Sequence, residues 1–281
     1  MKIKDLRTAF VDRLQDHYPL EEVQSFFQIT AHYFLGYSRM DIVLQLEEVV
    51  EEVKVQQFLT TCDRLKNHEP IQYILGDTEF YGLPFKVTPA TLIPRPETEE
   101  LVSWILEDLP KDTTLQLLDI GTGSGCIAIS LAKHMEQANV TAYDISEDAI
   151  KVASENAISN KITVTFKTVD ILKTTRLDQT YDCIVSNPPY VRELEKEEIQ
   201  SNVLDHEPHS ALFVSDTDPL VFYRAIGKLA FDNLSGNGRL FFEINQYLGK
   251  ESIQLLKEIG FTHVALRQDI FGNDRMIKAS R

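Results

Sequence analysis

The sequence predicts an α/β protein in which a small bundle of helices precedes a mostly parallel, seven-stranded sheet. Three observations carry this prediction: an apolar helical periodicity up to about residue 75, a proline-rich stretch over 80–98, and an alternation of strand and helix patterns from residue 113 onward. Strands that alternate with helices require crossover connections, which produce a parallel sheet covered by helices on both faces.

Length and composition fit one large domain joined to a small one. The chain has 281 residues, of which 43% are hydrophobic, so a packed core is expected. Its formal net charge of -15 opposes phosphate backbones, and no run of five basic residues offers a local patch. We therefore expect no direct contact with nucleic acid.

The cysteines and the apolar runs exclude further classes of protein. Cys62, Cys126 and Cys183 are odd in number and form no Cys-x-x-Cys or Cys/His spacing, so neither a disulfide framework nor a metal site is expected. The first ten residues lack the apolar stretch of a signal peptide, and no run approaches the ~18 apolar residues of a membrane span. The expectation is a soluble cytoplasmic protein, and nothing demands more than a monomer.

Residues 1–78 are predicted to form the helical bundle. Apolar residues recur at spacings of three and four, which places one apolar stripe along each helix. They are Ile3, Leu6, Phe10 and Leu14 in the first pattern and Val23, Phe26, Phe27, Thr30 and Phe34 in the second. Ser38 and Asp41 have the spacing of an N-cap with an acidic first turn, which starts a short helix through Leu44. A third long pattern covers 47–65.

Residues 79–98 are predicted to form a hairpin or linker between the two domains. Four prolines fall in this stretch: Pro84, Pro89, Pro94 and Pro96. Proline density of this kind excludes a helix and favours extended or hairpin connections. A helix is then expected from Pro96 to about Leu109, because proline and acidic residues are favoured in a first turn.

Residues 99–281 are predicted to form the α/β domain. Strands are expected at Leu115–Ile120, Val140–Ile145, Ile162–Thr168, Tyr181–Ser186, Arg239–Ile244, Val264–Arg267 and Arg275–Ala279. Helices are expected at Ser124–His134, Glu147–Asn160, Pro219–Leu234 and Gly249–Ile259. The regular alternation indicates crossover units, with the last two strands closing the sheet as a pair.

A glycine-rich turn follows the first of these strands and leads into a helix. Its residues, all predicted to bind a cofactor, are Gly121, Thr122, Gly123, Ser124 and Gly125. Open α/β sheets bind nucleotide-like ligands at this place, and glycine lets the backbone approach the ligand. The dinucleotide fingerprint would need a glycine at Cys126, and no phosphate-binding Gly-Lys-Ser/Thr follows. The loop therefore suits an adenosine ligand without a pyrophosphate, and S-adenosylmethionine fits that description.

Acidic residues after successive strands support the same ligand. Asp144 ends the second strand with Ile145 beside it, where a carboxylate can accept hydrogen bonds from a ribose diol. Asp170 and Ile171 follow the third strand, where a carboxylate and an apolar neighbour can hold the adenine. Each acid alone would be an ordinary turn residue, but Asp119, Asp144 and Asp170 at one end of three successive strands indicate a cofactor site.

The fourth strand is followed by Asn187, Pro188, Pro189 and Tyr190, the most specific signal in the chain. Two consecutive prolines make the turn stiff. The Asn187 side-chain oxygen and the Pro188 carbonyl can each accept one N–H of an NH₂ group, which orients that nitrogen and stabilises the charge developing on it. Tyr190 can stack on a planar substrate group. The four residues are predicted to bind substrate, and Asn187, Pro188 and Tyr190 to be catalytic, in methyl transfer to a planar nitrogen.

With these motifs the sequence resembles the HemK/PrmC family of release factor glutamine methyltransferases. The resemblance is carried by EPIQYILG over 69–76, IPRPETE over 93–99, the glycine loop, and SNPPY over 186–190. It implies the class I, Rossmann-like S-adenosylmethionine-dependent fold, S-adenosylhomocysteine as the product, and a further contact of Asn187 with the cofactor. It also implies the substrate, the glutamine of a Gly-Gly-Gln motif in a peptide chain release factor, docked by the helical bundle.

Two departures from the family pattern stand near the expected site. Glu243-Ile244-Asn245 occurs where members often carry Glu-His-Gly, and Ile171 occurs where many carry an aromatic residue. Both are expected to alter packing or edge contacts of the adenine and to leave the amide-holding turn untouched.

Three further features are interpreted as structural. The HEPH stretch over 206–209 is predicted to be a loop with solvated histidines, because Pro208 rules out a helical metal-binding pair. The charge run Arg192–Glu198 is predicted to be a solvated face or a mobile cover. Cys126 and Cys183 are expected to be core thiols rather than nucleophiles.

Two other functions stay open on the sequence alone. Adenine-N6 methylation of DNA or RNA would use the same Asn-Pro-Pro-Tyr geometry, and a non-catalytic partner protein would keep only the cofactor loop. Residues 1–90 hold nine Lys or Arg against fourteen Asp or Glu, which disfavours a nucleic-acid reader. The presence of Asn187, the predicted catalytic residue, disfavours a non-catalytic partner protein that only binds S-adenosylmethionine.

Overall fold

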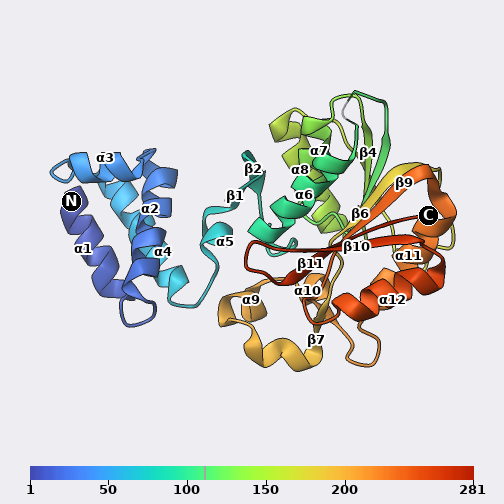
Figure 1. Ribbon diagram of the computed structural model, residues 1–281. Coiled ribbons are helices and arrows are strands. Elements are labelled where there is room, and N and C mark those ends of the chain that lie inside the picture. Colours follow the sequence, from blue (N-terminus) through green and yellow to red (C-terminus); the bar gives the residue numbers. More distant parts are fainter. Residues whose placement is uncertain (111) are drawn as a thin grey trace. The chain divides into compact units, whose positions relative to one another are not determined.

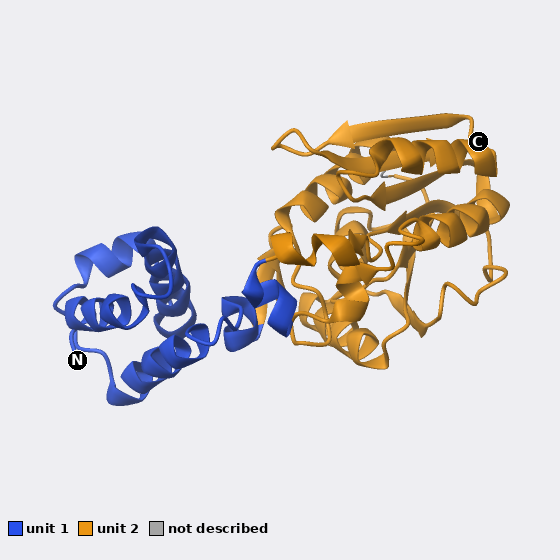
Figure 2. Cartoon of the chain, turned by 90° about the horizontal axis from the view of Figure 1, so that it is seen from below, with its two compact units in different colours: residues 1–76, 200–206 blue, residues 77–199, 207–281 orange. Residues whose placement is uncertain are grey.

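The structure, a computed structural model, describes residues 1–110 and 112–281, which form two compact units (Figure 2). One unit comprises Met1–Gly76 with Gln200–His206, and the other comprises Asp77–Ile199 with Glu207–Arg281. The sequence predicts domains at 1–78, 79–98 and 99–281. By its contacts the proline-rich stretch belongs to the second unit, and the short segment 200–206 groups with the first.

The first unit is a set of helices around one apolar core. They are α1 (Ile3–Leu14), α2 (Leu20–Leu35), α3 (Arg39–Leu44), α4 (Glu52–Leu65) and α5 (Ile71–Leu75). The short helix α9 (Ser201–His206) groups with this unit but has no buried residue. Phe27 stands at the centre, with its ring 5.5 Å from that of Phe10 and 5.6 Å from that of Phe58, all three fully buried. The predicted cap of α3 is confirmed, since the Asp41 amide donates to Ser38 Oγ at 3.2 Å and the Ser38 amide donates to Asp41 Oδ2 at 2.9 Å.

The helix predicted over 47–65 begins only at Glu52. The preceding residues pair with the start of the chain instead. The Ile3 amide donates to the Glu48 carbonyl at 3.0 Å, and the Val50 amide donates to the Met1 carbonyl at 2.8 Å. These backbone bonds hold 48–50 extended, and so they set the true start of α4.

The second unit is built on the predicted seven-stranded, mostly parallel sheet, which is confirmed (Figure 1). Its strands are β3 (Gln116–Ile120), β4 (Asn139–Asp144), β5 (Thr165–Thr168), β6 (Tyr181–Ser186), β9 (Leu234–Glu243), β10 (His263–Gln268) and β11 (Asp274–Ser280). Their order across the sheet is β10-β11-β9-β6-β3-β4-β5. Only β11 runs antiparallel to its neighbours, β9 and β10.

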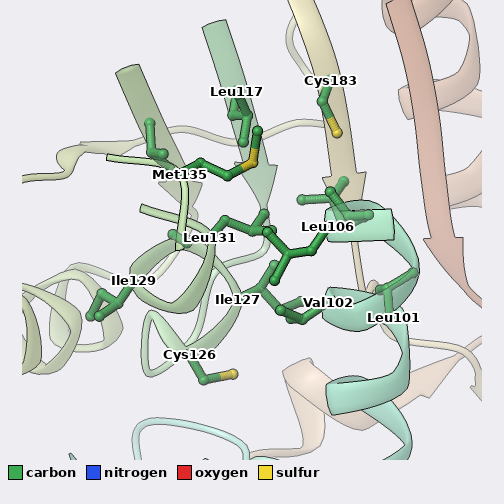
Figure 3. Close-up of a cluster of buried hydrophobic side chains, with 14 of the residues drawn as sticks. Leu101, Val102, Leu106, Leu117, Cys126, Ile127, Ile129, Leu131, Met135 and Cys183 are labelled. Atoms are coloured by element: carbon green, nitrogen blue, oxygen red, sulfur yellow. The ribbon is translucent and has the colours of Figure 1, made fainter. Parts of the chain in front are cut away.

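Helices cover both faces of the sheet. They are α6 (Pro96–Asp108), α7 (Cys126–His134) and α8 (Glu147–Asn160) on one face, and α11 (Val221–Asn233) and α12 (Gly249–Ile259) on the other. On the first face Leu106 of α6 and Leu131 of α7 pack with Leu117 of β3 and Cys183 of β6 (Figure 3). This packing holds the start of α7, and therefore the glycine loop before it, against the sheet.

The hairpin β1 (Asp77–Phe80) and β2 (Leu83–Lys86) overlaps the stretch 79–98, for which a hairpin or linker is predicted. Other short elements escape the sequence patterns: the 3₁₀ helix η1 (Glu193–Glu198), the helix α10 (His209–Leu212), and the strand pair β7 (Val191–Arg192) and β8 (Phe213–Val214). The hairpin turns at Tyr81 and Gly82, with φ of +51° and +72°, as a two-residue hairpin turn requires. Within the described residues, no helix has the length and apolar character needed to cross a membrane.

Truncation of Phe58 to alanine should remove the centre of the core of the first unit. We expect the free energy of unfolding of that unit to fall by about 3–5 kcal/mol, because a large buried ring leaves a cavity. Val53→Ala on the same helix is the matched control, since Val53 is 70% exposed and its loss should cost less than about 0.5 kcal/mol. Hydrogen exchange of the α1 and α4 amides measures the stability of both variants. If Phe58→Ala and Val53→Ala lost protection equally, the assigned core would be contradicted.

Candidate active site

A cavity of about 410 Å³ lies at the carboxyl ends of the central strands. Ile120 of β3 pairs with Tyr143 of β4 and with Ser186 of β6, so the loops after these strands begin side by side. The cavity is lined by most of the predicted residues: Gly121, Thr122, Gly123, Ser124, Asp144, Ile145, Asp170, Ile171, Asn187, Pro188 and Pro189. Gly125 and Tyr190 stand outside this lining. The site therefore occupies the point where the strand order reverses around β3.

The glycine loop presents bare backbone to the cavity. The angle φ is +76° at Gly121 and +55° at Gly123, a region that residues with side chains rarely adopt. The amides of Gly121 and Thr122 both donate to the Tyr143 carbonyl, at 2.8 and 2.9 Å. These bonds fold the loop back over the end of β4.

Gly125 packs the loop against the helices beneath it. An added Cβ at this position would stand 3.0 Å from Ile129 Cδ1 and 3.1 Å from Ala153 Cβ. The buried Asn156 side chain of α8 donates to the Ser124 carbonyl at 2.9 Å. Gly125 thus allows the loop, α7 and α8 to pack closely together, and it lies outside the cavity lining.

Asp144 holds the glycine loop and the start of α8 together. Its Oδ2 accepts the Gly123 amide at 2.8 Å, and its Oδ1 accepts the Ser146 amide at 2.9 Å. Burial raises the pKa of Asp144, and the backbone hydrogen bonds oppose that rise. Because each carboxylate oxygen has a second lone pair, a pair of ligand hydroxyls can still donate to it.

Two buried polar atoms beside the loop lack a hydrogen-bond partner in the described part of the chain: Asp119 Oδ1 and Ser124 Oγ. The other oxygen of Asp119 accepts the Thr122 hydroxyl at 2.6 Å. Burial raises the pKa of Asp119 to about 7, with the Thr122 bond opposing the rise and the charge of Asp144 adding to it. Buried polar atoms are normally paired, and of these two residues Ser124 lines the cavity, where a polar ligand can supply the missing hydrogen bond.

The residues after β5 supply an apolar wall with a charged edge. Ile171 is buried in this wall, and Ile145 contributes from the loop after β4. Asp170 pairs with Lys173 at 2.8 Å and accepts the Leu172 amide at 3.1 Å, and these contacts lower the pKa of Asp170. The combination suits a flat heteroaromatic ring with a hydrogen-bonding edge.

The Asn-Pro-Pro-Tyr turn adjoins the glycine loop. A Cβ built on Gly121 would meet the Asn187 carbonyl at 4.0 Å, and the Ser186 hydroxyl donates to the Ile120 carbonyl at 2.7 Å. Asn187 Nδ2 donates to Thr98 Oγ1 at 3.2 Å. Across residues 1–110 and 112–281 no hydrogen bond reaches Asn187 Oδ1, so this oxygen is free to accept a ligand N–H.

Tyr190 anchors the turn from behind. Its hydroxyl donates to Glu243 Oε1 at 3.0 Å, and its ring packs against the core on the α11 and α12 face. Burial raises the pKa of Tyr190 well above its ordinary range. The sequence predicts that Tyr190 stacks on the substrate, whereas the contacts in the structure give it the role of a brace.

The prediction that the Glu243-Ile244-Asn245 departure leaves this turn untouched is wrong. Asn245 Nδ2 donates to the Tyr190 carbonyl at 3.0 Å and to Glu195 Oε2 at 2.9 Å. Glu195 is only 6% exposed and also accepts bonds from Arg192. The charge run Arg192–Glu198 is therefore not wholly a solvated face, because one of its acids is buried against the turn.

A further part of the cavity lining comes from segments that the sequence patterns leave unassigned to the site. They are Ala90, Thr91, Leu92, Pro94, Arg95 and Thr98 before and within α6, and Pro208, Ser210 and Ala211 at α10. Glu207 joins the two segments, since its buried carboxylate accepts the Ile93 amide at 3.1 Å and pairs with Arg95. The proline pattern of the first segment predicted only a hairpin or linker, and the IPRPETE motif over 93–99 supported the family resemblance without a role in the site.

The predicted loop at 206–209 is confined to Glu207 and Pro208, while its histidines lie at helix ends, His206 partly exposed and His209 exposed. His206 ends α9, and its Nε2 lies 3.0 Å from the Asn67 carbonyl, while His209 begins α10. The described residues contain no group of His, Cys, Asp and Glu side chains that could hold a metal ion.

The cysteines are core thiols, as predicted. Cys62, Cys126 and Cys183 are free and buried. Burial raises the pKa of Cys126 to about 12 and raises the pKa of Cys183 further. Neither thiol near the cavity can ionise readily, so neither is a nucleophile.

Comparison with known proteins matches both units. The family model described as methyltransferase small domain matches residues 101–211, and the model described as PrmC N-terminal domain matches residues 5–76. The release factor glutamine methyltransferase of Flavobacterium psychrophilum is 52% identical over 283 residues, which cover 100% of this chain and 99% of that protein. The protein of the same name from Bacteroides thetaiotaomicron is 45% identical over 276 residues, covering 98% and 99%.

A solved structure shows the likeness of fold. The methyltransferase from Pyrococcus furiosus matches with a TM-score of 0.53 at 18% identity, over 82% of this chain and 98% of that one.

Replacement of Asp119 by asparagine should change how stability depends on pH. A carboxyl with a pKa of about 7 in the folded state and about 3.9 in the unfolded state binds its proton more tightly when folded. Its contribution to the free energy of unfolding is therefore present below pH 4 and lost as pH rises to about 7. We expect the difference in free energy of unfolding between the wild type and Asp119→Asn to fall by a few kcal/mol between pH 4 and pH 7. Denaturant titrations at several pH values measure this difference. A difference that does not change with pH would contradict the raised pKa of Asp119.

Proposed function

The chain belongs to the family of release factor glutamine methyltransferases, and we propose from this premise how its cavity performs the family's reaction. The enzyme transfers a methyl group from S-adenosylmethionine to a glutamine side chain of a peptide chain release factor. The observation that carries our assignment of the site is that the glycine loop and Asn187 line one cavity.

We assign the cofactor to the glycine loop and the walls beside it. The bare backbone of Gly121 and Gly123 can approach the amino-acid part of the cofactor, and the unpaired hydroxyl oxygen of Ser124, which lines the cavity, suits its ammonium group. Asp144 has lone pairs left for the two ribose hydroxyls. When bound, S-adenosylmethionine supplies an electrophilic methyl group on a positively charged sulfur.

Ile145 and Ile171 are proposed to enclose the adenine, with Asp170 at its amino edge. The sequence-based expectation that the isoleucine at 171 changes adenine packing stays a prediction. An aliphatic side chain covers the ring by dispersion contacts and lacks the additional stacking term of an aromatic neighbour.

The substrate amide is proposed to bind at Asn187 and Pro188. An amide nitrogen is a weak nucleophile because its lone pair is delocalised, so the enzyme must hold it in line with the methyl group. Asn187 Oδ1 and the Pro188 carbonyl each accept one N–H, and both acceptors stabilise the positive charge that grows on the nitrogen. A strong general base is unnecessary, because the nitrogen becomes acidic only once methylated and can then release its proton to water.

The surrounding turn keeps these acceptors in place. Pro188 and Pro189 restrict the backbone, while Tyr190 is tied to Glu243 and Asn245 behind the turn. The acceptors are therefore preorganised and need little rearrangement when charge develops.

We propose that the glutamine belongs to the Gly-Gly-Gln motif of the release factor and that the helical unit docks that protein. Two adjacent glycines would let the substrate backbone enter a narrow cavity without side chains in the way. We further propose that the enzyme acts as a monomer in the cytoplasm, where release factors meet ribosomes, without touching nucleic acid. The acidic net charge supports the last point.

Adenine methylation is the weaker hypothesis. The same turn could hold an adenine amine, but the relatives that match the full length are named for release factor glutamine. A transfer assay that offers a release factor beside duplex and single-stranded DNA distinguishes the two, and label on DNA alone would overturn the proposed substrate.

Replacement of Asn187 by alanine should separate binding from chemistry. We expect cofactor affinity to stay within about tenfold of the wild type, and transition-state stabilisation to fall by ~2–4 kcal/mol. Mass spectrometry of a release factor incubated with enzyme and cofactor measures the gain of one methyl group and its site, and calorimetry measures the affinity.

Asn237→Ala is the matched control for this variant. Asn237 is exposed at the opposite end of β9 from Glu243 and should leave the methylation rate unchanged. A wild-type rate in Asn187→Ala would remove Asn187 from the reaction.

A further inference from the structure

A row of hydrogen bonds runs from a buried carboxylate to the side-chain amide of Asn187. Glu243 at the end of β9 is 1% exposed, and its Oε2 accepts the Thr98 hydroxyl at 2.6 Å. Thr98 on α6 is 3% exposed, and its Oγ1 accepts Asn187 Nδ2 at 3.2 Å. The three side chains come from separate elements, so only the folded chain assembles this row.

The carboxylate sets the direction of every bond in the row. Glu243 Oε2 accepts the Thr98 hydroxyl while Glu243 Oε1 accepts the Tyr190 hydroxyl, so the Thr98 proton points to Glu243. The oxygen of Thr98 then has only lone pairs to offer Asn187, and it can be met only by the NH₂ end of that amide. The Asn187 carbonyl oxygen is consequently turned away from Thr98.

The orientation matters because the two ends of an asparagine amide have opposite hydrogen-bonding character. With Oδ1 free, Asn187 accepts an N–H from the incoming glutamine. With the amide rotated by half a turn, its NH₂ group would face the NH₂ group of the substrate, and two donors would oppose each other. The oxygen and NH₂ ends of the Asn187 amide have similar shapes, so packing alone does not favour one orientation. A hydrogen-bonding neighbour must therefore fix it.

We propose that Glu243, acting through Thr98, is a positioning residue that fixes the Asn187 amide with its oxygen toward the substrate. This inference rests on the proposed function and deepens it, since it names what makes Asn187 an acceptor. Neither Glu243 nor Thr98 touches the reacting atoms.

Glu243 is itself held at a fixed point. Its second oxygen accepts the Tyr190 hydroxyl at 3.0 Å, and its backbone carbonyl accepts the Tyr223 hydroxyl at 3.2 Å. Phe242 beside it pairs with Ser186, the residue before Asn187. One carboxylate thus braces the turn through Tyr190 and orients its amide through Thr98.

The first test compares two substitutions of Thr98. Thr98→Val keeps the shape and removes the hydroxyl, and we expect kcat to fall roughly tenfold to a hundredfold with a smaller change in KM. Thr98→Ser keeps the hydroxyl and should recover most of that loss. Thr141→Val, at a buried threonine of β4 outside the row, should leave kcat unchanged. Cofactor affinity and melting temperature are measured for each variant to show that the fold and the cofactor site persist.

The second test asks whether the effect passes through Asn187. Glu243→Gln is nearly isosteric but cannot accept from both Thr98 and Tyr190, so it should also lower kcat. In an Asn187→Ala background there is no amide left to orient, and single-turnover rates should then show little further loss from Thr98→Val, whereas Glu243→Gln should keep the part of its loss that passes through the Tyr190 brace.

The outcomes separate the two proposals. If Thr98→Val lowered the rate equally in the wild-type and Asn187→Ala backgrounds, the positioning role would be overturned. It would also be overturned if Thr98→Val and Glu243→Gln both kept the wild-type kcat while Asn187→Ala was slow. A wild-type rate in Asn187→Ala would instead overturn the proposed function together with this inference.

Discussion

The lateral pairing of β3 with β6 is the constraint on which the site depends. It sets Ile120 opposite Ser186, and so the glycine loop and the Asn-Pro-Pro-Tyr turn leave the sheet at neighbouring points. Parallel strands end at a common edge, which turns two separate stretches of sequence into two walls of one cavity. A shift of that register by one residue would turn the side chains of β6 to opposite faces and displace the turn from the cofactor loop.

Burial of acids is the second constraint, and it has a cost. Asp119 and Glu243 are both fully enclosed, and burial raises the pKa of each carboxyl. A buried acid is tolerated when it is hydrogen-bonded, and hydroxyl donors from Thr122, Thr98 and Tyr190 meet this need. The same bonds that make burial tolerable also fix the walls of the cavity, so stability and preorganisation have a common source.

The long elements could be predicted because their signal is periodic and repeated. The strands β3, β4 and β6 and the helices α7, α8 and α12 lie where the apolar patterns place them. Elements of a few residues, such as the strand pair β7–β8 and the helix α10, are too short to show a period. β9 begins at Leu234, earlier than predicted. The prediction missed the first part of the strand because Gly236 and Gly238 interrupt the apolar pattern that marks the rest of it.

By itself the sequence determined the fold class and marked the glycine loop and the Asn-Pro-Pro-Tyr turn as the candidate site, because each depends on local backbone preferences of glycine and proline or on a regular apolar period. Only the tertiary structure decided which distant polar groups share a buried space. Thr98 and Glu243 are 145 positions apart, and Asn245 and Tyr190 are 55 positions apart. No local pattern marks such pairs, because their bonds arise only when the sheet and the helices that cover it have packed.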